Sequence, residues 1–154
     1  MSPRAACRLA TLGFTEVYDY AAGKVDWLAH GLPAEGTTAA EPTAGSLARD
    51  DVATCSLEDE AGAAMSRISA SPYGYALVTG PGRTVLGRVR RSALEQAEAG
   101  LAVEQLMESG PSTIRPHVLV RELHERFERS PVKTLIVTTP AGELLGVLRR
   151  DQVR

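Results

Sequence analysis

Apolar residues recur at helical spacing in two separate stretches of the chain. The first stretch has a predicted buried face made of Leu57, Ala61, Ala64, Met65 and Ile68. The second has Val120, Leu123 and Phe127 on one face and charged residues on the other. Such spacing predicts an amphipathic helix. Ser-Pro follows each stretch, and proline disfavours helical geometry in the residue before it, so both helices are predicted to end there.

Two pairs of short apolar runs follow these helices and predict β-hairpins. The runs are 75–79 with 84–90, and 134–138 with 144–148. Turns that contain Gly and Pro separate the runs of each pair. A second helix is expected from about Ser92, a residue that can serve as its N-cap. Since the second copy ends with Arg154, its matching helix is expected to be missing or one turn long.

The helix-and-hairpin pattern is an internal repeat. A shift of 59 positions aligns residues 51–94 with 110–153 without a gap, and 11 of these 44 positions are identical. Only about 3 identities are expected by chance from ordinary composition. The identical pairs include Thr54/Thr113, Gly87/Gly146 and Arg90/Arg149. Most of the chain is therefore predicted to consist of two similar units.

Composition narrows the class of protein. The chain has 154 residues, 44% of them hydrophobic, which is enough for a sizeable core, and a net charge of −2 that gives no pull toward nucleic acid or membrane. No apolar run approaches the roughly 20 residues that span a bilayer, and the N-terminus has no signal-peptide core, so a cytoplasmic protein is expected. The two cysteines and three scattered histidines indicate no disulfide framework, metal site or catalytic centre.

A helix, a strand pair and a helix, repeated, resemble a tandem pair of cystathionine-β-synthase-type (CBS) domains. The resemblance is carried by the strand–turn–strand segments 75–90 and 134–149, each with a glycine in its second strand, and by 107–116, which is similar to the entry into a second CBS domain. It covers about residues 46–154. It implies an α+β fold of two CBS-type repeats, 47–100 and 101–154, packed about a pseudo-twofold axis that leaves two clefts. Residues 37–46 are small and polar and read as a linker.

Residues 5–36 resemble the C-terminal part of a rhodanese domain. The similar features are a helix that ends at Leu-Gly-Phe, a strand at 17–20, a second helix from Gly23 and a Gly-Leu-Pro exit. Residues 1–36 are thus predicted to form a helix–strand–helix appendage. In rhodaneses the nucleophilic cysteine lies in a loop before the first of these helices. Cys7 lies inside the predicted helix, so no catalytic residue is predicted, and its role is expected to be structural.

Adenosyl ligands commonly bind in the clefts of CBS pairs, and the resemblance implies a Gly-apolar-apolar-Thr/Ser-x-x-Asp pattern after the second strand. Arg90 and Arg149 replace the hydroxyl residue here, and Asp151 stands one residue before the acid's place. Guanidinium groups suit phosphate, so Arg90 and Arg149 are candidate contacts for it. The alternative is a pair of solvated strand ends that bind nearby acids. Thr54 and Thr113 are expected to open the helix of each copy, as further cleft candidates or as simple caps.

These features predict a regulatory, non-enzymatic module that requires no cofactor. Its candidate ligand is an adenosyl or other phosphate-bearing compound in the cleft between the repeats, with the adenine nucleotides AMP, ADP and ATP as candidates. Its expected assembly is a homodimer that acts on an unidentified regulated protein. Two alternatives stay open. One is an interaction or dimerisation module without a ligand. The other is a sulfurtransferase relic whose cysteine loop comes from a partner.

Overall fold

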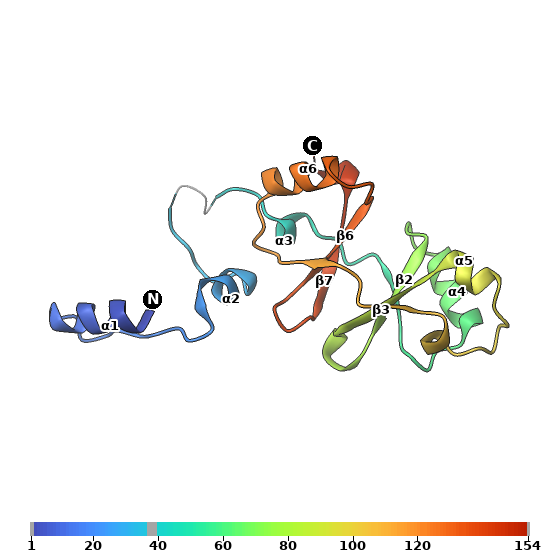
Figure 1. Ribbon diagram of the computed structural model, residues 1–154, viewed down its shortest axis with the longest axis horizontal. Coiled ribbons are helices and arrows are strands. Elements are labelled where there is room, and N and C mark those ends of the chain that lie inside the picture. The colour runs from blue at the N-terminus through green and yellow to red at the C-terminus, as the bar shows by residue number, and fades with distance from the viewer. Residues whose placement is uncertain (1, 37–39, 154) are drawn as a thin grey trace.

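The computed structural model describes residues 2–36 and 40–153, and it consists of two small sheets, each covered by a helix, with an N-terminal arm (Figure 1). The arm contains α1 (Ser2–Thr11) and α2 (Gly23–Ala29). The first repeat contains α3 (Ala44–Leu47), β1 (Ala53–Cys55), α4 (Ala61–Ser69), β2 (Tyr75–Thr79), η1 (Pro81–Arg83), β3 (Val85–Arg90) and α5 (Arg91–Glu95). The second contains η2 (Val103–Gln105), β4 (Glu108–Ser109), β5 (Thr113–Ile114), α6 (Val120–Glu128), β6 (Thr134–Thr138), β7 (Leu144–Arg149) and η3 (Arg150–Gln152).

The strands form a four-stranded sheet in the order β1-β2-β3-β4 and a three-stranded sheet in the order β5-β6-β7. The predicted hairpins are β2–β3 and β6–β7, which are antiparallel, and each carries a bulge at the same repeat position. β1 and β5 pair in parallel with β2 and β6. The sequence pattern did not predict β1 and β5, because runs of three and two residues are too short to show an alternating period.

Each sheet packs one face against the helix that the apolar spacing predicted. Ile68 of α4 is fully buried with Val78 and Val89 of the first sheet. Leu123 of α6 is fully buried in the second core, which it shares with Phe127. Burial of one such side chain stabilises the fold by about 1.5–3 kcal/mol. The α+β class is therefore confirmed, with two equivalent helix-on-sheet layers.

The segment before each repeat packs against the sheet of the other repeat. Ala44 of α3 is buried in the core of the second sheet, whereas Val103 of η2 is buried in the core of the first. Arg49 bridges to Val147 of β7, and Glu108 pairs with Arg88 of β3. Arg49 and Glu108 are 59 positions apart, and so are Arg88 and Val147, so the two pairings are equivalent. Ala44 and Val103 are also 59 positions apart, so the repeat extends upstream to these positions. α3 therefore begins inside the segment 37–46 that was expected to be a linker.

The N-terminal arm forms both predicted helices but not the predicted strand. Residues 17–20 have no strand pairing among the described residues, because no neighbouring strand lies beside them to share hydrogen bonds. The arm extends away from both sheets (Figure 1), and Tyr18 is 87% exposed. Inside it, the Tyr20 ring packs edge-on against Trp27 with 5.1 Å between ring centroids. Cys7 is exposed, so it is not the small buried side chain that the sequence predicted.

Candidate functional site

A cavity of about 320 Å³ lies between the two repeats. The first repeat contributes Tyr75 and Arg88, and the second contributes Pro111, Ser112, Arg126, Phe127, Ser130, Val132, Thr134, Leu135 and Ile136. Its volume is at the lower end of the roughly 300–1,000 Å³ typical of small-molecule sites. Its wall combines apolar side chains, four hydroxyls and two guanidinium groups, with no carboxylate. The cavity therefore suits a small ligand that has a flat apolar part and a negative charge.

Arg88 lies on β3, on the face that looks toward the other repeat. Its Nη2 donates to Glu108 Oε2 at 2.6 Å, and its guanidinium carbon lies 5.8 Å from the centroid of the Tyr75 ring. Its Nε is buried and has no hydrogen-bond partner among the described residues. A buried donor without an acceptor costs about 1–3 kcal/mol.

Arg126 lies on α6 at the repeat position of Arg67. In the first repeat the Asp59 carboxylate binds Arg67, and that hydrogen bond holds the pKa of Asp59 below its usual value. The position equivalent to Asp59 is Val118, which has no charge. Arg126 accordingly forms no ion pair or hydrogen bond within 2–36 and 40–153. Its guanidinium group is free to bind an anion.

The corresponding cleft of the first repeat has a different inner wall. The position equivalent to Arg88 is Val147, which is fully buried, and the position equivalent to Val132 is Tyr73, which is 4% exposed, whereas Val132 is 42% exposed. Tyr73 packs with Val52 and Val147 in a third apolar cluster between the sheets. Its hydroxyl donates to Asp51 Oδ1 at 2.9 Å. The two clefts expected from a pseudo-twofold pair therefore differ in their side chains.

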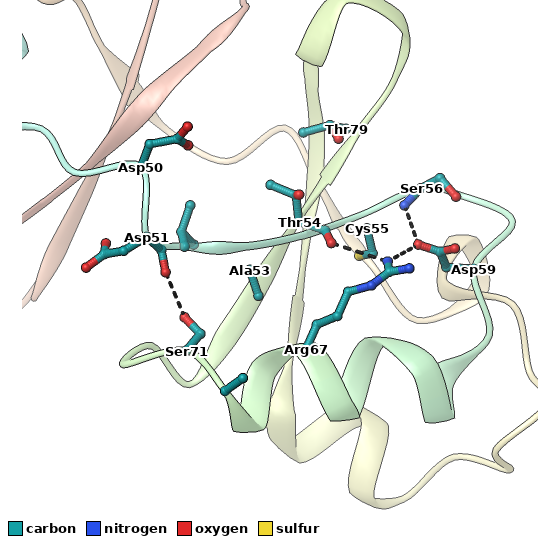
Figure 2. A pocket seen from close by; sticks show the side chains of 12 residues that line it. Asp50, Asp51, Ala53, Thr54, Cys55, Ser56, Asp59, Arg67, Ser71 and Thr79 are labelled. Atoms are coloured by element: carbon teal, nitrogen blue, oxygen red, sulfur yellow. Dashed lines mark hydrogen bonds and ion pairs between the residues drawn. The ribbon is translucent and has the colours of Figure 1, made fainter.

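The first repeat's cleft is a larger hollow of about 630 Å³ against β1 and α4 (Figure 2). Its residues Arg67 and Ser71 are the repeat partners of Arg126 and Ser130 in the smaller cavity. Asp50, Asp51 and Asp59 line it, and Figure 2 shows Arg67 reaching from α4 to Asp59 and to the Thr54 carbonyl. Because Asp59 neutralises Arg67, the only guanidinium group in this wall is already bound. Carboxylates in excess disfavour a phosphate ligand by like-charge repulsion. The smaller cavity is therefore the better candidate for an anionic ligand.

The structure places the residues predicted as cleft candidates in three different settings. Thr54 and Thr113 lie on β1 and β5 and do not open the helices, because a strand and a loop precede each helix. Thr54 lines the larger hollow, whereas Thr113 lines neither the hollow nor the smaller cavity. Arg90 Nε donates to Glu108 Oε1 at 2.6 Å, and Arg149 Nη2 donates to Asp151 Oδ2 at 2.6 Å.

Neither Arg90 nor Arg149 lines the 320 Å³ cavity, although both lie close to it in the sheets. They are the cross-strand neighbours of Tyr75 and Thr134, respectively. The sequence patterns did not indicate Arg88 or Arg126 as site residues. A signal for Arg126 was present, because the repeat keeps the arginine at 67 and 126 but replaces Asp59 by Val118. Arg88 gave no such signal, since its repeat partner is the apolar Val147.

Known proteins with CBS domains are similar to this chain in sequence or in fold. Residues 103–154 match the model of the CBS domain family. A search among curated proteins finds no match to the chain. Among solved structures, the CBS domains of a transcriptional regulator from Streptococcus pneumoniae superimpose with a TM-score of 0.64 at 15% identity, over 72% of this chain and 95% of that one.

Two further structures are similar at the same level. The CBS-pair protein CBSX2 from Arabidopsis thaliana, solved in complex with AMP, gives a TM-score of 0.62 at 18% identity over 73% of this chain and 92% of that one. The cytosolic domain of the Mg²⁺ channel MgtE in complex with ATP gives 0.65 at 16% identity, over 73% of this chain and 47% of that one. This chain is thus a protein of the CBS-pair fold. Its second repeat is the part that the CBS domain model matches.

No helix within the described residues combines the length and the apolar character that a membrane span requires.

Proposed function

We propose that this chain is a non-catalytic regulatory module that senses an adenine nucleotide in the 320 Å³ cavity and acts on a partner protein. The observation that carries the proposal is the pair Arg88 and Arg126, because two guanidinium groups from different repeats line one small cavity and Arg126 forms no ion pair among the described residues. Two proteins of the same fold were solved with AMP and with ATP, which supports this ligand class.

The cavity wall suggests how such a ligand would be held. The adenine ring would lie against apolar surface from Pro111 and Val132, beside the Tyr75 ring. Arg88 and Arg126 would bind phosphate oxygens, since guanidinium groups match the geometry of phosphate. No carboxylate lines the cavity, so a ribose would meet only hydroxyl groups such as Ser112 and Thr134. Recognition would depend mainly on phosphate, and adenosine should bind more weakly than AMP.

Calorimetric titration of adenosine, AMP, ADP and ATP tests the proposal. In Arg126→Ala and in Arg88→Ala the loss of one charged contact of about 1.5–3 kcal/mol should weaken nucleotide binding roughly ten- to a hundredfold. Arg129→Ala is the matched control, because Arg129 is an exposed arginine on the turn after α6 and lies outside the cavity wall. Arg90→Ala and Arg149→Ala test the strand-end arginines in the same way. Unchanged affinity in both cavity variants, or no heat with any nucleotide, would refute the nucleotide-sensing function.

We also propose that the chain associates as a homodimer. Leu12, Phe14, Tyr18 and Val25 of the N-terminal arm are exposed large apolar side chains, and a group of such residues favours protein contact. A closed twofold dimer is the commonest way to cover such a surface. The same observation supports the alternative of an interaction module without a ligand. Light scattering that gives a strict monomer mass of 16.4 kDa across micromolar concentrations would contradict the dimer.

A further inference from the structure

The carboxylate of Glu108 joins the two arginines on the inward-facing side of β3. Its Oε2 accepts from Arg88 Nη2 and its Oε1 accepts from Arg90 Nε, both at 2.6 Å. Arg88 lines the cavity, and Arg90 is the cross-strand neighbour of the cavity residue Tyr75. One acid therefore occupies donors of both guanidinium groups at the edge of the proposed ligand site.

The backbone does not require an acid at this position. The repeat partner of Glu108 is Arg49, and both residues make the same antiparallel pairing, Glu108 with Arg88 and Arg49 with Val147. A basic residue is thus accommodated in the equivalent place. The side chain of Glu108 is also half exposed, so it contributes nothing to core packing. What the carboxylate changes is the availability of the two arginines.

We infer that Glu108 is a built-in competitor for the anionic group of the ligand and sets how strongly the cavity accepts phosphate. An incoming phosphate must compete with Glu108 for Arg88, because Glu108 already holds its Nη2. The carboxylate also places a negative charge beside the site, which opposes each added phosphate charge. The inference rests on the proposed phosphate-bearing ligand and names the residue that tunes its affinity.

The test uses the full chain and inorganic pyrophosphate as the probe, so that it does not depend on adenine recognition. Glu108→Gln removes the charge and keeps the shape. Glu104→Gln is the matched control, because it removes the same charge from an exposed residue of the same segment that forms no ion pair among the described residues. Calorimetry should show pyrophosphate binding at least about threefold tighter in Glu108→Gln than in Glu104→Gln and wild type. In the double variant Glu108→Gln/Arg88→Ala the gain should disappear.

Three results of the pyrophosphate titrations would contradict the role of Glu108. Equal or weaker pyrophosphate binding in Glu108→Gln, a gain that survives Arg88→Ala, or no binding in any variant would overturn the inference. Glu108→Asp serves as a second variant if Glu108→Gln does not fold, since the shorter acid should loosen the hold on both arginines and give a smaller gain. If wild type binds no nucleotide but Glu108→Gln still gains pyrophosphate affinity, the proposed function fails and the role of Glu108 stands.

Discussion

The Tyr75 hydroxyl donates a hydrogen bond of 3.1 Å to Thr134 Oγ1, and these two residues are repeat partners, 59 positions apart. A contact between two equivalent positions places the pseudo-twofold axis between them. The isolated bridge between Thr84 and Glu143 also joins two repeat partners and lies on the same axis. The two partners are a tyrosine and a threonine, so the axis relates the two backbones while the side chains of the two clefts differ. The Tyr75 side chain crosses the axis and lines the open cavity.

Removal of the Tyr75 hydroxyl should weaken the interface between the repeats. We expect Tyr75→Phe to lower the free energy of unfolding by about 0.5–1.5 kcal/mol, the usual net value of one hydrogen bond. Urea denaturation of Tyr75→Phe, Thr134→Val and the double variant measures the coupling between the two residues. Additive effects of the two single substitutions would show that the bond contributes nothing.

Nucleotide should bind with a stoichiometry of one per chain. Three aspartates line the hollow of the first repeat and oppose a phosphate, and Val147 offers no charge where the second cleft has Arg88. In Tyr73→Val the fold should lose about 2–4 kcal/mol through the missing ring, but the stoichiometry should stay at one. Calorimetry gives the stoichiometry and urea denaturation gives the stability. Two sites of similar affinity in wild type would show that the acidic hollow of the first repeat also binds nucleotide.

Gly146 should tolerate no side chain. Its φ of +153° lies in the region that favours glycine, and an added Cβ would lie 2.7 Å from the Arg49 carbonyl oxygen. Gly146→Ala should therefore separate β7 from the segment after α3 and cost about 1–3 kcal/mol or more. Gly74→Ala is the control, because no heavy atom lies within 4 Å of its Cβ position and its φ is not positive. Thermal unfolding that shifts equally in both variants would contradict this reading.

The Glu108 ion pairs should stabilise the fold only above acidic pH. Hydrogen bonds from Arg90 and Arg88 lower the pKa of Glu108 from its ordinary 4.5 to about 2. A depressed carboxyl pKa gives stability that is complete above pH 4.5 and is lost as the pH falls toward 2. Because the side chains are half exposed, screening limits this stability to about 1 kcal/mol or less. The difference in unfolding free energy between wild type and Glu108→Gln should therefore shrink from pH 7 to pH 3.

Glu104→Gln should show a much smaller pH-dependent difference, because Glu104 is exposed and forms no ion pair among the described residues. A difference for Glu108→Gln that stays constant or grows on acidification would contradict the assignment. In 1 M salt the difference should also fall, since the Debye length is then about 3 Å.

The sequence by itself determined the local elements and their repetition. The helices α4 and α6 and the two hairpins follow from short-range patterns of apolar residues, which each segment shows without reference to the rest of the chain. The 59-residue repeat predicted two equivalent units for the same reason. The alignment of the two repeats was begun at position 51, although the identical pair Leu47 and Leu106 continues it upstream. Polar and small residues around 37–46 concealed that α3 belongs to a core.

Only the tertiary structure decided which side chains form the site. The sequence pointed to Arg90 and Arg149 because they are repeat partners, but both are held by acids outside the cavity wall. Arg88 and Arg126 line the cavity, and they come from different repeats. Whether an arginine is free or paired depends on the acids that long-range packing brings beside it, such as Asp59 against Arg67. The packing of Tyr73 against Val147 likewise depends on residues from both repeats, and a local pattern carries no record of such contacts.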